Sequence, residues 1–133
     1  MTRDQLQAWI DTYERAWRTH GTDLLRELFA DDASYSTAPF ENPFRGLAAI
    51  ADFWEEGRDG PDEEFTMTSE PVAVEGDTGV ARIEVRYGDD GSHYRDIWIV
   101  RLDDSGRCVH FEEWPFWPPG TKGGWHEGPS QPS

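Results

Sequence analysis

Two acidic residues, Asp96 and Glu113, lie in segments whose alternation otherwise places apolar side chains on one face of a strand. Successive strand residues point to opposite faces of a sheet, so every second residue shares a face. The residues that share a face with Asp96 or Glu113 are Tyr94, Trp98, Val100, Val109 and Phe111. A carboxyl group among such neighbours is disfavoured in its charged form, and its pKa rises toward neutrality. The pattern therefore predicts general acid–base chemistry that needs no cofactor.

We hypothesise that Asp96 and Glu113 flank a bound ligand, one removing a proton and the other returning it. Tyr13, on the apolar face of an expected helix, would stabilise negative charge that develops on an oxygen. Structural roles are equally open at this point. Asp96 can accept hydrogen bonds from the backbone or from Tyr13, Glu113 can reach water near the strand end, and Tyr13 can be a core residue. A β-bulge would turn either carboxyl group to the opposite face.

Other reactive residue types form no recognisable site. His110, Glu112 and Glu113 are close in sequence, but adjacent strand residues point to opposite faces and cannot converge on one metal ion. No glycine-rich phosphate loop and no nucleophile elbow occurs. We therefore expect neither a metal nor another cofactor. The single cysteine, Cys108, excludes an intramolecular disulfide, fits a reducing compartment, and is read as a small buried apolar residue.

The first half of the chain is patterned as helix. Apolar residues recur at spacings of three and four over residues 6–17, and a second short apolar stripe covers residues 24–29. A brief strand is expected over residues 33–37 and a loop with two prolines over 39–46. A third helix carries Leu47, Ile50, Phe53 and Trp54 on one side.

The second half is patterned as four strands, over residues 65–74, 80–87, 93–102 and 107–116. Turns rich in glycine and aspartate separate them, at residues 75–77, 88–91 and 103–106, and a further turn at 60–62 precedes the first. Consecutive hairpins produce antiparallel pairing, so the predicted class is α+β. We expect one domain over residues 1–117 and a loosely ordered tail, rich in proline and glycine, over 118–133, which Trp125 could anchor.

Alternation also describes the outer face of this sheet. Ile97, Ile99 and Trp114 are too apolar for a face in contact with water, which predicts a homodimer through the outer face. Cover by the C-terminal tail is the alternative. Cys108, His110, Glu112 and Trp114 are expected to share that face, and His93 lies there by the same parity.

The overall charge limits the class of partner. The 133 residues carry a net charge of −15, whereas nucleic acids and anionic membranes select clustered positive charge. We therefore expect neither as a partner. The N-terminal residues have no apolar signal region and no apolar run could span a bilayer, so a cytoplasmic location is expected.

Several of these segments together resemble the SnoaL-like family of the nuclear transport factor 2-like superfamily. The resemblance rests on Tyr13, the Leu28–Ala33 segment, the Asn42–Gly46 loop, the helix with Ile50, Phe53 and Trp54, and the strands around the 103–107 turn. It implies three N-terminal helices on a strongly curved, mostly antiparallel sheet, a cystatin-like α+β roll. In this family the roll forms a cone around a pocket for a small, apolar molecule, and dimers form through the outer sheet face.

The resemblance also implies candidate residues. Compared with ketosteroid isomerase, Tyr13 matches the tyrosine that binds the oxyanion, but the position of the base falls on Thr37 and that of the protonated aspartate on Trp98. Isomerisation by that catalytic set is therefore not expected. The predicted ligand-binding residues are Trp17, Tyr35, Thr37, Phe53, Trp54, Val85, Tyr94, Trp98 and Phe111. The predicted function is an isomerase, cyclase or dehydratase for an apolar carbonyl compound, the alternatives being a non-catalytic ligand-binding protein or a dimeric interaction module.

Overall fold

A computed structural model describes residues 1–57, 64–88 and 93–119 of the chain. The helices are α1 (Arg3–Trp17), α2 (Leu25–Leu28) and α3 (Leu47–Gly57). The strands are β1 (Phe29–Ser36), β2 (Phe44–Arg45), β3 (Phe65–Glu75), β4 (Thr78–Tyr87), β5 (His93–Leu102) and β6 (Cys108–Phe116). The predicted α+β class and its four long strands are confirmed. The predicted turn at 60–62 and Trp125 lie outside the described residues. So do most of the turn at 88–91 and most of the tail at 118–133.

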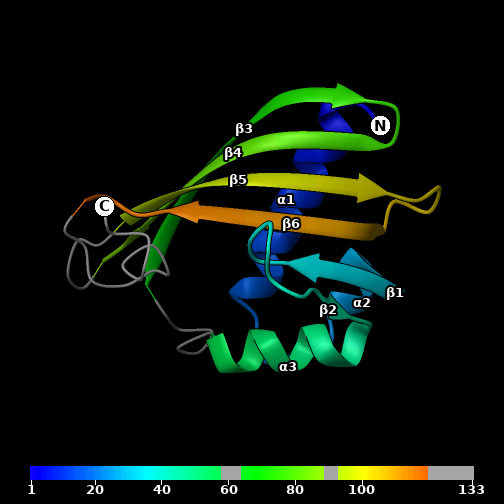
Figure 1. The fold of residues 1–133 in the computed structure, drawn as a ribbon, viewed down its shortest axis with the longest axis horizontal. Helices are drawn as coiled ribbons and strands as arrows, with labels where there is room; N and C mark the ends of the chain where they lie inside the picture. Colours follow the sequence, from blue (N-terminus) through cyan, green and yellow to red (C-terminus); the bar gives the residue numbers. More distant parts are fainter. Residues whose placement is uncertain (58–63, 89–92, 120–133) are drawn as a thin grey trace.

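One sheet in the order β2-β1-β6-β5-β4-β3 forms the frame of the molecule. β3 to β6 form an antiparallel meander, whereas β1 pairs with β6 in parallel. That parallel pairing joins the first strand of the chain to the last and aligns Tyr35 with Phe111. α1 crosses behind the long strands, and α3 lies below β1 and β2 (Figure 1).

The N-terminal half differs from its predicted pattern in three places. The apolar stripe at residues 24–29 is a single helical turn followed by β1, which starts at Phe29 rather than at residue 33. The expected loop at 39–46 contains the short strand β2. These differences arise because strand pairing determines where a strand begins: β1 pairs with β6, which is distant in sequence, and β2 pairs with β1.

Packing against the helices buries the inner face of the sheet. Ala81, Ile83, Val85, Trp98 and Val100 are buried there, as alternation predicts. Cys108, predicted on the outer face, is instead fully buried on the inner one. The register shifts because Arg101 pairs with His110 while Leu102 pairs with Cys108, which leaves Val109 as the extra residue of a bulge.

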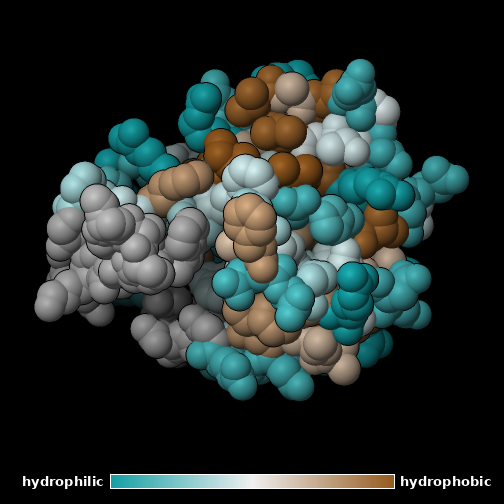
Figure 2. Space-filling model, in the orientation of Figure 1, coloured by the Kyte–Doolittle hydropathy of each residue, from teal (hydrophilic) through white to brown (hydrophobic). Residues whose placement is uncertain are grey.

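The outer face of the sheet carries both apolar and charged side chains. Figure 2 shows hydrophobic side chains gathered over the part of this face formed by β3, β4 and β5. Ile97, Ile99 and Trp114 are partly exposed, and Val72 is exposed. No helix among the described residues is long and apolar enough to cross a membrane.

Candidate functional site

A cavity of about 360 Å³ opens at one end of the sheet, between the inner face and the ends of α1 and α3. Its wall is mostly aromatic and apolar. The lining residues are Tyr13, Trp17, Tyr35, Thr37, Phe53, Phe65, Met67, Val85, Tyr87, Tyr94, Trp98, Glu113, Pro115 and Trp117. A volume of this order lies at the lower end of the range for small-molecule sites.

Strand alternation and helical spacing explain how these residues meet. Tyr13 and Trp17 are one turn apart on α1, so both face the sheet. Trp98 and Glu113 stand directly opposite each other on β5 and β6, and residues opposite each other in an antiparallel pair share a face. The shift at Val109 lies before Phe111, so it leaves Glu113 facing the cavity.

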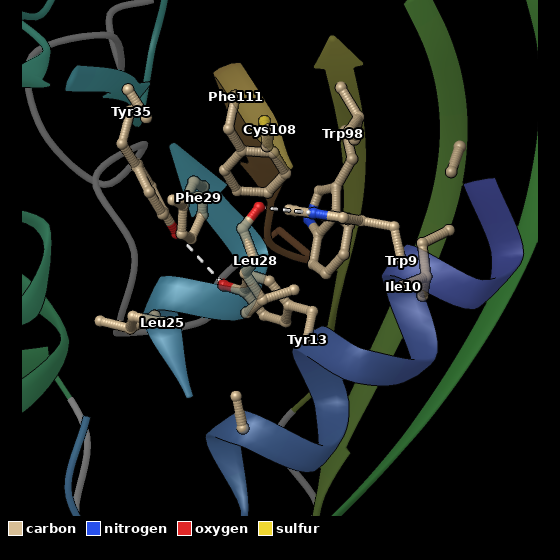
Figure 3. Close-up of a cluster of buried hydrophobic side chains, with 14 of the residues drawn as sticks. Trp9, Ile10, Tyr13, Leu25, Leu28, Phe29, Tyr35, Trp98, Cys108 and Phe111 are labelled. Carbon is tan, nitrogen blue, oxygen red and sulfur yellow. Dashed lines mark hydrogen bonds between the residues drawn. The ribbon is translucent and has the colours of Figure 1, made fainter. Parts of the chain in front are cut away.

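Glu113 is the carboxyl group of the cavity wall, and hydroxyl groups surround it. The Tyr35 hydroxyl donates a hydrogen bond to Oε1 of Glu113 at 2.5 Å. The Tyr35 and Tyr13 hydroxyls are 3.2 Å apart and hydrogen-bonded, as Figure 3 shows. These contacts form a chain from α1 through β1 to β6.

Asp96 lies behind this wall rather than on it. It is 1% exposed and is not among the lining residues. Neither of its carboxyl oxygens has a hydrogen-bond partner of normal geometry among the described residues, and the same holds for the indole nitrogen of Trp98. Burial raises the pKa of Asp96 well above its usual range, and the neighbouring Glu113 charge adds to this rise.

Burial also raises the pKa of Glu113, while hydrogen bonds from Tyr35 and from Asp96 act in the opposite direction. Two carboxyl groups at short distance disfavour each other's ionisation, and the charge of Glu113 accordingly adds to the rise at Asp96. Of the two, Glu113 has the hydrogen bond from Tyr35 that favours its charged form.

The tyrosine hydroxyls remain protonated over the ordinary pH range. Burial, and next the charge of Glu113, raises the pKa of Tyr13, Tyr35 and Tyr94 well above the usual value. Each can therefore donate a hydrogen bond without becoming charged. Two hydroxyls next to a carboxylate in an apolar cavity are the parts needed to move a proton and to hold an oxyanion.

The predicted binding residues fall into two groups. Trp17, Tyr35, Thr37, Phe53, Val85, Tyr94 and Trp98 line the cavity, whereas Trp54 and Phe111 are buried behind it. Trp54 packs edge-on against Tyr13 and Trp17, and Phe111 packs against Trp98. Because their rings are buried in the core, these two residues support the wall rather than line it.

The wall also includes residues that sequence reasoning missed: Phe65, Met67, Tyr87, Pro115 and Trp117. Tyr87 shares the parity of Val85 in the segment 80–87, which was a usable signal. Met67 reaches the wall because it pairs with Val85. Trp117 follows the last strand, where alternation no longer applies, and its ring lies 4.7 Å from that of Tyr94.

A second polar group of side chains lies on the outer sheet face. Oγ of Ser34 is 2.7 Å from Nδ1 of His110, and Nε2 of His110 is 2.8 Å from Glu112. The Trp114 indole donates to the same Glu112. This chain connects β1 to β6, and it accounts for His110 and Glu112 without a metal. No group of three metal-ligating side chains occurs within 1–57, 64–88 and 93–119.

Comparison with known families agrees with this architecture. Residues 8–111 match the model of the SnoaL-like domain, which covers most of the chain. The chain belongs to the SnoaL-like domain family. No curated protein matches this SnoaL-like chain.

Solved structures share the fold of this SnoaL-like protein. A protein from Sinorhizobium meliloti, provisionally described as a polyketide cyclase, matches with a TM-score of 0.62 and 24% identity over 85% of this chain and 99% of its own. A protein from Kribbella flavida, provisionally described as a ketosteroid isomerase, matches with a TM-score of 0.64 and 18% identity over 92% and 81%. A structure named "Rd1NTF2_04 with long sheet" matches with a TM-score of 0.61 and 15% identity over 80% and 97%. At these identities the likeness concerns the fold alone.

Proposed function

We propose that this SnoaL-like protein binds a small, mostly apolar carbonyl compound and catalyses a cofactor-independent isomerisation, cyclisation or dehydration of it. The observation that carries the proposal is the placement of Glu113, a carboxyl group on the wall of an aromatic cavity. The names of the two bacterial relatives, a cyclase and an isomerase, agree with chemistry of this class.

In this mechanism Glu113 removes a proton from a carbon next to the carbonyl group and later returns it to the product. Tyr13 donates a hydrogen bond to the carbonyl oxygen, on which negative charge develops. Tyr35 holds Glu113 in position. Asp96, which does not line the cavity, acts through Glu113 as a positioning residue that keeps a single negative charge in the pair.

The test uses 2-tetralone as a probe, because its ring system is apolar and its C1 protons are acidic. Deuterium incorporation at C1 is followed by proton NMR in heavy water, with and without the protein. We expect the protein to accelerate exchange and Glu113→Gln to reduce that acceleration by about 100-fold, as for the loss of a general base.

Glu112→Gln is the matched control, because the neighbouring residue has the same side chain but lies on the outer face. It should exchange deuterium at the parent rate. Equal rates for the parent and a folded Glu113→Gln protein would contradict the catalytic proposal.

One observation favours a second candidate, a binding protein without turnover. The 2.5 Å hydrogen bond from Tyr35 already occupies an oxygen of Glu113. A carboxylate satisfied in this way can serve to recognise a ligand rather than to remove its proton. Saturable binding of the probe without any exchange would favour this candidate.

We also propose that the protein forms a homodimer through the outer sheet face. The partly exposed Ile97, Ile99 and Trp114 on this face support the proposal, because isolated monomers rarely leave such side chains together in water.

A further inference from the structure

The charges around the cavity are of one sign. Among the described lining residues, Glu113 carries the only carboxyl group, and no lysine, arginine or histidine lines the wall. Asp96 adds a second carboxyl group directly behind it. A buried carboxylate without a positive partner is costly unless something compensates its charge.

No described basic side chain compensates this pair. The ion pairs formed by described residues join other groups, such as Arg82 to Glu70 and Arg95 to Glu84. Arg18 contacts one residue of the cavity wall: its guanidinium lies 3.9 Å from the centre of the Phe65 ring. However, Arg18 is paired with Glu14 at 2.9 Å and does not line the cavity.

Aromatic residues share the cavity wall with Glu113. Trp98 stands opposite Glu113 across the β5–β6 pair, and Tyr94 and Trp117 pack against each other nearby on the same wall. Aromatic faces stabilise an ammonium group through the ring quadrupole, and several rings around one carboxylate form a cage for such a group. The net charge of −15 further attracts cations toward the protein and repels anions.

We propose that the ligand of this cavity is a cationic carbonyl compound: it also carries a protonated or quaternary amine nitrogen, which lies between the Glu113 carboxylate and the ring of Trp98. This inference rests on the proposed function, because it specifies the class of molecule that the cavity binds. A positive nitrogen would pair the carboxylate, and its alkyl or aryl groups would fill the apolar wall. It would also increase the acidity of a neighbouring C–H bond, which assists proton removal by Glu113.

The experiment compares two probes of nearly equal shape, phenyltrimethylammonium and tert-butylbenzene, which differ in charge. Binding is measured by quenching of tryptophan fluorescence, since Trp17, Trp98 and Trp117 line the cavity, and is repeated by calorimetry. We expect the parent protein to bind the cation about tenfold or more tightly than the neutral probe, as a desolvated cation–π contact with a carboxylate implies. Glu113→Gln should remove this preference, so that the two probes bind the variant with affinities within about twofold of each other.

Glu112→Gln again serves as the matched control and should keep the preference for the cation. If the neutral probe binds the parent as tightly as the cation, or more tightly, the cationic class is wrong while a ligand-binding cavity remains supported. If neither probe binds, this inference fails, whereas the proposed function is judged by the deuterium exchange of 2-tetralone. A preference for the cation that persists in Glu113→Gln would also overturn the inference, because it would arise from the surface charge instead.

Discussion

The hydrogen-bonded chain Tyr13–Tyr35–Glu113, with Asp96 behind it, determines which proton positions are available in the cavity. Burial favours the neutral form of every member, whereas a donated hydrogen bond favours the charged form of a carboxyl group. Glu113 has such a donor in Tyr35, and Asp96 lacks a donor of normal geometry among the described residues.

Tyr35→Phe tests this distribution of charge. The Tyr35 hydrogen bond lowers the pKa of Glu113, so its loss should raise that pKa further. The base form of Glu113 would then appear at higher pH. We expect the pH profile of deuterium exchange to shift upward by about one to two units, since one charge-assisted hydrogen bond is worth roughly 1.5–3 kcal/mol. An unchanged profile would show that Tyr35 does not support the base.

Asp96→Asn tests the link between the buried acid and stability. The pKa of Asp96 is raised in the folded protein, so the folded state holds a proton that the unfolded chain releases above its ordinary pKa. Its contribution to stability is therefore complete below that ordinary pKa and is lost as pH rises toward the folded value.

We expect the free energy of unfolding of the parent to fall more steeply than that of Asp96→Asn as the pH rises above about 4, by up to about 1.4 kcal/mol per pH unit. Urea unfolding at several pH values measures both slopes. Parallel slopes would mean that Asp96 is ionised in the folded protein.

The turn between β5 and β6 sets the register that aims Glu113 at the cavity. Oδ1 of Asp103 accepts hydrogen bonds from the backbone N–H groups of Ser105 and Arg107, and Gly106 has a φ of 89°. A side chain at that φ is strained even though an added Cβ would meet no atom within 4 Å. The turn therefore depends on glycine for its backbone angle rather than for space.

Gly106→Ala should lower the free energy of unfolding by about 1 kcal/mol, whereas Gly106→Asn should cost less because asparagine tolerates the left-handed region. Thermal unfolding of the three proteins provides the comparison. An alanine variant as stable as the parent would mean that the turn adopts another conformation.

At the level of the whole molecule, the sheet separates a wet, charged and partly apolar outer face from a cavity on the inner one. The Ser34–His110–Glu112 chain satisfies the polar groups of the outer face where β1 meets β6. The apolar side chains next to it on β5 remain partly exposed in one chain. A second copy would cover them.

Ile99→Glu should dissociate the proposed dimer, because a charge at the centre of an apolar interface must lose its hydration there. Sedimentation velocity measures the distribution of species, with Asn42→Glu, in an exposed loop, as the control of equal charge change. We expect a dimer for the parent and the control, and a folded monomer for Ile99→Glu. A parent protein that sediments as a monomer at high micromolar concentration would refute the dimer.

Much of this molecule follows from local pattern. The alternation of residues 80–87 and 93–102 assigns Val85, Asp96 and Trp98 to the inner face, and glycine–aspartate turns identify the meander between those strands. The spacing of Tyr13 and Trp17 places both on one helical face. These features depend on the periods of helix and strand, which are properties of neighbouring residues alone.

Tertiary structure decided which inward-facing residues border empty space and which fill the core. Asp96 and Glu113 lie on the same face of the sheet, yet of the two only Glu113 lines the cavity, where it meets Tyr35 across the parallel β1–β6 pair. That pair joins residues 78 positions apart in sequence, and the bulge at Val109 reverses Cys108 without any local signal. The sequence by itself determined the face on which each carboxyl group lies. Only long-range packing, which no local period encodes, decided which of them could meet a ligand.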